Sequence, residues 1–133
     1  MDAFDTPSKI DLKYAEDKIV FVICDCSLDK KYSFYYGYDR TLAKKLIDRL
    51  KHIQEHTWKQ FSALGRKDGL TVEKPGESFE MIHNQNSCPN NMLEQYYFHF
   101  RVEKEDLFRV FGYQYKHYFC ITHLDYKGKI QHS

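Results

Sequence analysis

The last third of the chain constrains the fold most, because it holds three strand-like segments joined by very short connectors. The segments are QYYFHFRVE (95–103), LFRVFGYQ (107–114) and HYFCITHLD (117–125), and all are rich in aromatic and β-branched residues. The connectors KED and YK are long enough only for tight turns. Strands joined in this way lie side by side and run antiparallel, so the sequence predicts an antiparallel sheet.

The clearest helical pattern begins near residue 40. Apolar side chains recur there at three- and four-residue spacing, at Leu42, Leu46, Leu50 and Ile53. Asp39 or Thr41 can cap this helix. Its other face is basic and carries Arg40, Lys44, Lys45, Arg49 and Lys51. Most charged helix faces contact water, so solvation is the default interpretation, and RNA binding by Lys44, Lys45 and Arg49 is the functional alternative.

A second, shorter helix is predicted directly after the first. The sequence TWKQ (57–60) has the form of a capping box, with a hydroxyl at the N-cap and a glutamine three residues later. Trp58, Phe61 and Leu64 are expected to face the core, and Gly65 is expected to end the helix.

The N-terminal part of the chain adds a further β element. KIVFVICDC (18–26) is a continuous apolar run bounded by charges, which predicts a buried strand. KKYSFYYGY (30–38) follows after a short link, so we expect the two segments to pair as a hairpin. Residues 1–17 are polar and acidic and are expected to form a loose arm or a short first element. Residues 66–94 are rich in turn residues and are expected to be a polar insert.

These elements predict a single α+β domain over residues 1–133, with an antiparallel sheet packed on two helices and an extra N-terminal β-hairpin. The net charge of +1 means that any binding of nucleic acid must come from a local patch. The sequence shows neither a charged-then-apolar N-terminus nor an apolar run of membrane-spanning length, so we expect a cytoplasmic protein without membrane contact.

The cysteines give no sign of a metal site. Cys24, Cys26, Cys88 and Cys120 are expected to be reduced thiols in the cytoplasm. The spacing of Cys24 and Cys26 is too tight for a zinc knuckle, and no second pair at knuckle spacing follows. We therefore expect no metal and no other cofactor. A nucleophile elbow and a phosphate-cradling glycine loop are also lacking from the sequence.

Alternation along the strands decides which side chains can meet. In a regular strand 117–125, one face carries His117, Phe119, Ile121, His123 and Asp125, and the other carries Cys120. His117 and His123 are then about 20 Å apart, too far to share a metal ion. We interpret His117 and His99 as structural or surface histidines.

The same alternation predicts a polar stripe on the closing strands. It comprises Arg101, Arg109, His123 and Asp125, followed by Lys127, Lys129 and His132 just past the last strand. Arginine and lysine suit phosphate binding, while histidine and aspartate suit proton transfer. Nearby tyrosines offer stacking surfaces for bases. For Arg109, a structural pair and anion binding are equally open interpretations.

These motifs resemble a known family. The helix pair with basic outer faces, the strand LFRVFGY and the ending YFCITHLDYKGK resemble the RelE/ParE/HigB class of small bacterial toxins. The ending also resembles short proteins of bacterial mobile elements, in which a tryptophan-containing turn follows the first long helix, as EHTWKQF (55–61) does here. The resemblance covers residues 30–65 and 95–133.

The resemblance implies a metal-independent endoribonuclease of a toxin–antitoxin or phage-defence system, with messenger RNA as substrate and an antitoxin protein as partner. By this resemblance Arg109 clamps a phosphate, and His123, Asp125 and His132 act as acid/base catalysts. Arg101, Lys127 and Lys129 then bind RNA electrostatically. Many such toxins cut RNA in the ribosome, and a net charge of +1 argues against that ribosome-dependent mode here.

The alternative is a non-catalytic protein-interaction or nucleic-acid-binding module of a phage or mobile element. A tyrosine-rich surface and a near-zero net charge fit a protein partner as well as RNA. A nuclease needs its histidine, aspartate and arginine in one concavity, whereas a binding module leaves them scattered and exposes an apolar patch.

Overall fold

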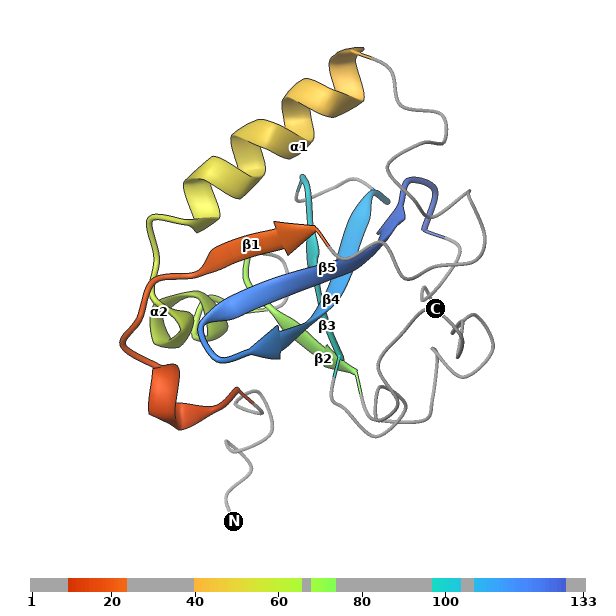
Figure 1. Ribbon diagram of the computed structural model, residues 1–133. Coiled ribbons are helices and arrows are strands. Elements are labelled where there is room, and N and C mark those ends of the chain that lie inside the picture. Colours follow the sequence, from red (N-terminus) through yellow and green to blue (C-terminus); the bar gives the residue numbers. More distant parts are fainter. Residues whose placement is uncertain (1–9, 24–39, 66–67, 74–96, 104–106, 129–133) are drawn as a thin grey trace.

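The computed structural model describes residues 10–23, 40–65, 68–73, 97–103 and 107–128. They form a five-stranded mixed sheet and two α-helices, which confirms the α+β class (Figure 1). The strands are β1 (Val20–Ile23), β2 (Thr71–Glu73), β3 (Tyr97–Arg101), β4 (Arg109–Tyr115) and β5 (Tyr118–Asp125). The helices are α1 (Arg40–Ile53) and α2 (Trp58–Ser62), preceded by a short 3-10 helix, η2 (Leu12–Tyr14).

The strand order in the sheet is β1-β5-β4-β3-β2. The pairs β2–β3, β3–β4 and β4–β5 are antiparallel, as the short connectors predict, but β1 lies parallel to β5. The expectation of a wholly antiparallel sheet is therefore wrong for one strand. The physical reason is that no tight turn joins β1 to β5, so the local sequence does not fix their relative direction.

β1 differs from its predicted environment as well. It is an edge strand of the described sheet, and Val20, Val22 and Ile23 have exposed fractions of 39%, 38% and 66%. The prediction of a buried strand is thus wrong, because an apolar run alone does not tell which strand will lie at an edge. Its predicted hairpin partner, 30–38, lies outside the described residues.

A β-bulge changes which side chains of β5 share a face. Phe111 pairs with His123 while the next residue, Gly112, pairs with Ile121, so Thr122 is an extra residue on β5. Ile121 is therefore directed to the core together with Leu124, and His123 to the opposite side. The prediction that Ile121 and His123 share one face is wrong, since strict alternation ends at the bulge.

The core lies between the two helices and one face of the sheet. Leu46 and Ile53 of α1 and Trp58 and Phe61 of α2 are buried in one cluster with apolar residues of β3, β4 and β5. The Trp58 ring stacks on Phe119 of β5 at a centroid distance of 6.1 Å. No helix of the described ranges is long and apolar enough to span a membrane.

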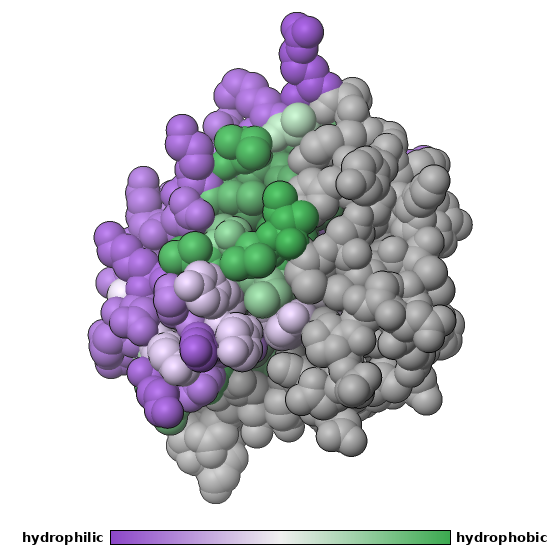
Figure 2. All heavy atoms as spheres, in the orientation of Figure 1, coloured by the Kyte–Doolittle hydropathy of each residue, from purple (hydrophilic) through white to green (hydrophobic). Residues whose placement is uncertain are grey.

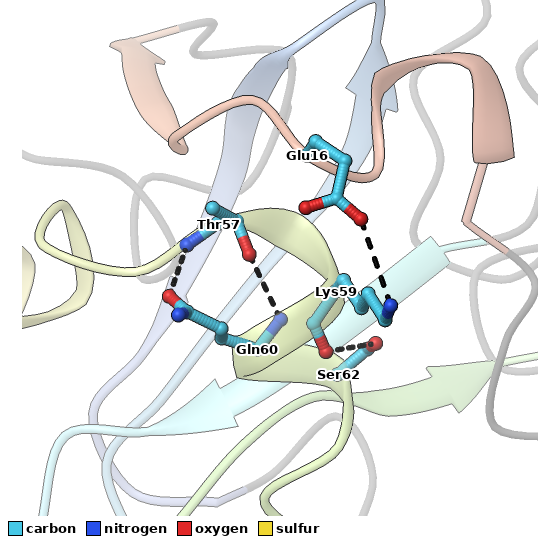
Figure 3. Close-up of polar contacts among 5 residues, drawn as sticks. All are labelled: Glu16, Thr57, Lys59, Gln60 and Ser62. Carbon is cyan, nitrogen blue, oxygen red and sulfur yellow. Dashed lines mark hydrogen bonds and ion pairs between the residues drawn. The ribbon is translucent and has the colours of Figure 1, made fainter.

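The start of α2 confirms the predicted capping box (Figure 3). Thr57 Oγ1 accepts a hydrogen bond from the Gln60 backbone N–H at 3.1 Å, and Gln60 Oε1 accepts one from the Thr57 N–H at 2.9 Å. The chain before β1 also caps this helix, because Trp58 N donates to Asp17 O and Lys59 N donates to Ala15 O. Residues 10–17 of the predicted arm thus contact α2.

The remaining predicted segment, 66–94, contributes the edge strand β2, which pairs with β3. Residues 74–94 of it lie outside the described part of the chain.

Candidate functional site

Four residues of the predicted polar stripe lie on one face of the sheet, opposite the helices: Arg101, Arg109, His123 and Asp125. Directly opposed residues of β3, β4 and β5 point to the same side, so they form rows across these strands. The first row is Arg101–Arg109–Asp125, the second is His99–Phe111–His123, and the third is Tyr97–Tyr113–Cys120. We call these nine residues the polar face; it is charged at the end formed by the first row and aromatic at the other.

The charged row combines two guanidinium groups with one carboxylate. Arg109 lies directly opposite Asp125 on one side and Arg101 on the other, at the cross-strand spacing of about 5 Å. Arg109 Nη1 donates a hydrogen bond to Leu107 O at 3.0 Å. The turn after β5 also approaches this group, because a Cβ added to Gly128 would lie 3.2 Å from Arg109 Nη1. The row carries a net positive charge, which suits an anionic group.

The row is only partly open to solvent. His123 and Asp125 have exposed fractions of 1%, and Arg109 of 9%. Arg101 is half-buried, and Lys127, two residues after Asp125, is exposed. Arg101 and Lys127 are therefore accessible to solvent, whereas the imidazole of His123 and the carboxylate of Asp125 lie beneath the surface.

His123 is held by the extra residue of the bulge. Its Nδ1 lies 2.8 Å from Thr122 Oγ1, and that hydroxyl donates to Phe111 O at 3.3 Å. Within the described part of the chain, no group forms a hydrogen bond with the buried Nε2 of His123. The arrangement connects the histidine ring to the backbone of β4.

The basic residues of α1 do not join the polar face, since α1 packs on the other side of the sheet. Arg49 donates from Nε to Arg101 O at 2.9 Å and from Nη2 to Asp68 O at 2.8 Å. Its guanidinium also lies over the rings of Phe61 and Phe100. Burial lowers the pKa of Arg49, partly offset by the charge of Asp68. The structure thus gives Arg49 a role in joining α1 to the ends of two other segments.

The two lysines of α1 that were candidates for RNA binding form ion pairs at the surface. Lys44 Nζ lies 2.7 Å from Asp48 Oδ2; this hydrogen bond raises the pKa of Lys44 and lowers that of Asp48. Lys45 Nζ lies 3.2 Å from Glu103 Oε1, so it links α1 to the end of β3. These two ion pairs offset the charges of Lys44 and Lys45.

Two candidates from the sequence, Lys129 and His132, lie outside the described residues. Among the residues described, no group of three or more His, Cys, Asp or Glu side chains could hold a metal ion. Because of the bulge, Cys120 lies on the same face of the sheet as His123, whereas strict alternation predicted opposite faces.

Sequence reasoning missed Thr122 and Gly112 as the residues that orient His123. The available signal was the glycine in the middle of the strand VFGY, because an internal glycine often marks a bulge or a close backbone approach. A Cβ at Gly112 would lie 2.2 Å from Cys120 O and 2.5 Å from Phe119 Cε1. Glycine is therefore needed where β4 passes the bulge.

Comparison of the chain with protein-family models, with curated proteins and with solved structures finds no match. The likeness to the RelE/ParE/HigB toxins therefore rests on the sequence motifs alone, and the function that it implies stays a prediction.

Proposed function

We propose that the chain acts on RNA through the charged end of the polar face, as a metal-independent endoribonuclease of the RelE type. The observation that supports this proposal is the convergence of Arg101, Arg109 and Asp125 in one row, with His123 in the next row on the same side of the sheet. Guanidinium groups bind phosphate, and an imidazole and a carboxylate can move the protons that cleavage at a 2′-hydroxyl requires.

Each residue then has a defined task. Lys127 and Arg101, which reach solvent, make the first contacts with the RNA backbone. Arg109 holds the phosphate to be attacked, and His123 and Asp125 are the proton carriers. Because these two are buried, cleavage requires a local movement that admits the phosphate. Lys129 and His132, which follow β5 in the sequence, add charge and a third proton carrier in this proposal.

The test is induced expression of the wild type beside Arg109→Ala and His123→Ala variants. We expect growth arrest with loss of messenger RNA in the wild type and relief in both variants. Loss of a general acid or base such as His123 lowers the cleavage rate about 10²- to 10⁴-fold, and loss of Arg109 removes the group that holds the phosphate. Both side chains are buried, so the unfolding temperature of each purified variant must be measured alongside. Absence of RNA cleavage by the folded wild type, with and without ribosomes, would refute the nuclease function.

A surface variant provides a test that does not depend on the core. Lys127→Ala removes one exposed charge at the charged row, and Lys59→Ala removes one exposed charge from α2, on the other side of the sheet. We expect only Lys127→Ala to weaken RNA binding and to reduce the slope of log affinity against log salt, by about 0.7 for one lost phosphate contact on single-stranded RNA. Equal effects of the two variants would contradict a site at the polar face.

A second candidate function, protein interaction, is favoured by one observation. Apolar side chains gather on the surface in the region of α1 and β1 (Figure 2). The exposed large apolar residues of these elements are Val20, Val22 and Ile23 on β1 and Ile47 on α1, the last with an exposed fraction of 52%. An apolar edge strand is a common docking site for an extended segment of another protein.

The same expression assay distinguishes the two candidate functions. Ile23→Asp places a charge in the apolar surface and leaves Lys127 and the polar face unchanged. Lys127→Ala removes a charge next to the charged row and leaves the apolar surface unchanged. A nuclease loses its effect on cells with Lys127→Ala, and a protein-interaction module loses it with Ile23→Asp.

A further inference from the structure

Thr122 and His123 are neighbours in the sequence, yet their side chains are in hydrogen-bond contact. In a regular strand, successive side chains point to opposite faces and do not meet. The bulge at Thr122 removes this restriction, and it places Thr122 Oγ1 between two partners, Phe111 O at 3.3 Å and His123 Nδ1 at 2.8 Å. All three groups are buried, so the contacts are shielded from competition with water.

The direction in which the Thr122 hydroxyl donates its proton determines which nitrogen of the His123 ring carries a proton. A hydroxyl has one proton to donate and lone pairs that accept. The carbonyl oxygen of Phe111 can only accept, so the bond at 3.3 Å uses the hydroxyl proton. The contact at 2.8 Å must then be donated by the ring, from Nδ1–H to Thr122 Oγ1. In the neutral imidazole one nitrogen carries the proton, which leaves the lone pair on Nε2.

We propose that Thr122 is a positioning residue that fixes the neutral imidazole of His123 as the Nδ1–H tautomer, with Nε2 as the atom that accepts a proton. The catalytic meaning of this assignment rests on the proposed nuclease function. The tautomer itself follows from the hydrogen bonds alone. In hydrolases with a serine–histidine pair, a partner on Nδ1–H similarly directs Nε2 to the reacting group.

The test is the protonation state of the two ring nitrogens, measured by ¹⁵N NMR of the full chain at a pH where His123 is neutral. In the wild type we expect Nδ1 to give the signal of a protonated ring nitrogen and Nε2 that of an unprotonated one. A predominant Nε2–H tautomer in the folded wild type would overturn the proposal without any variant.

Two substitutions of similar size test the part that Thr122 plays. Thr122→Val keeps the branched shape and removes the hydroxyl, and Thr122→Ser keeps the hydroxyl. We expect Thr122→Val to shift the tautomer ratio by up to about tenfold, a change that a single hydrogen bond can produce, and Thr122→Ser to retain the ratio of the wild type. An unchanged ratio in folded Thr122→Val would refute the role of the hydroxyl.

The failure of this proposal and the failure of the proposed function are distinguishable. If the wild type shows the Nδ1–H tautomer but cuts no RNA, the nuclease function is wrong and the assignment of the tautomer holds. If it cuts RNA and shows the Nε2–H tautomer, the function holds and Thr122 has no positioning role.

Discussion

The substitution Gly112→Ala tests the geometry that orients His123. The added Cβ would lie 2.2 Å from Cys120 O and 2.5 Å from a ring carbon of Phe119, whereas ordinary contacts begin at 3.4 Å. The backbones of β4 and β5 would therefore have to separate by about 1.2 Å, the difference between 3.4 and 2.2 Å. Neither neighbour can move freely, because Cys120 O belongs to the backbone of a central strand and Phe119 is fully buried in the core.

The expected loss of stability follows from these contacts. Overpacking of a core costs about 1–3 kcal/mol, and a clash with a strand backbone belongs at the upper end of that range. Replacing glycine also lowers the conformational entropy of the unfolded chain, which stabilises the folded state by about 0.4–1 kcal/mol. The net destabilisation is about 2 kcal/mol. An unfolding entropy of about 2.1 cal/mol/K per residue converts this, for 133 residues, to a fall in Tm of about 7 °C.

Thermal unfolding followed by circular dichroism measures this change, with Gly65→Ala as the matched control. Gly65 has a φ of 92° and nothing within 4 Å of an added Cβ, so that variant reports backbone strain of about 1 kcal/mol without a clash. We also expect the NMR signals of His123 to move in Gly112→Ala and not in Gly65→Ala. If Gly112→Ala unfolds at the temperature of the wild type, the close approach at the bulge does not exist in solution.

Two further substitutions test local contacts. Arg49→Lys removes the paired hydrogen bonds to Arg101 O and Asp68 O. We expect the free energy of unfolding, measured in urea, to fall by about 1–2 kcal/mol and the RNA affinity of the folded protein to stay unchanged. Unchanged stability with weaker RNA binding would show that Arg49 is an RNA-binding residue. Thr57→Ala removes the hydroxyl of the capping box, and we expect it to lower the free energy of unfolding by about 1 kcal/mol. Thr57→Ser retains the hydroxyl and serves as the control. Equal stability of the two variants would show that the cap does not stabilise α2.

The elements with strong local signals were predictable. The periodic leucines predicted α1, and the hydroxyl and glutamine of TWKQ predicted the start of α2. The two tight connectors predicted the antiparallel order of β3, β4 and β5. Each of these features depends on residues close together in the sequence. That proximity is why side-chain spacing and turn length were sufficient to predict them.

The candidate site was predictable only in part. Arg101, Arg109 and Asp125 were assigned to one stripe, and the structure places them in one row. The burial of Arg109 and Asp125 was not foreseen, since a polar residue in a strand is by default expected at the surface. Arg49 was assigned to RNA binding from its place on a basic helix face, but its two backbone partners are distant in the sequence and become visible only in the structure.

Local sequence patterns were enough to predict the helices, the closing hairpins and the charged residues near the end of the last strand. The parallel pairing of β1 with β5, at the edge of the described sheet, became known only from the tertiary structure, because no tight turn links these two strands. The tertiary structure also decided that Thr122 is an extra residue, which places His123 on the polar face and Ile121 in the core. A bulge is a property of two paired strands, and the residues of one strand do not specify it.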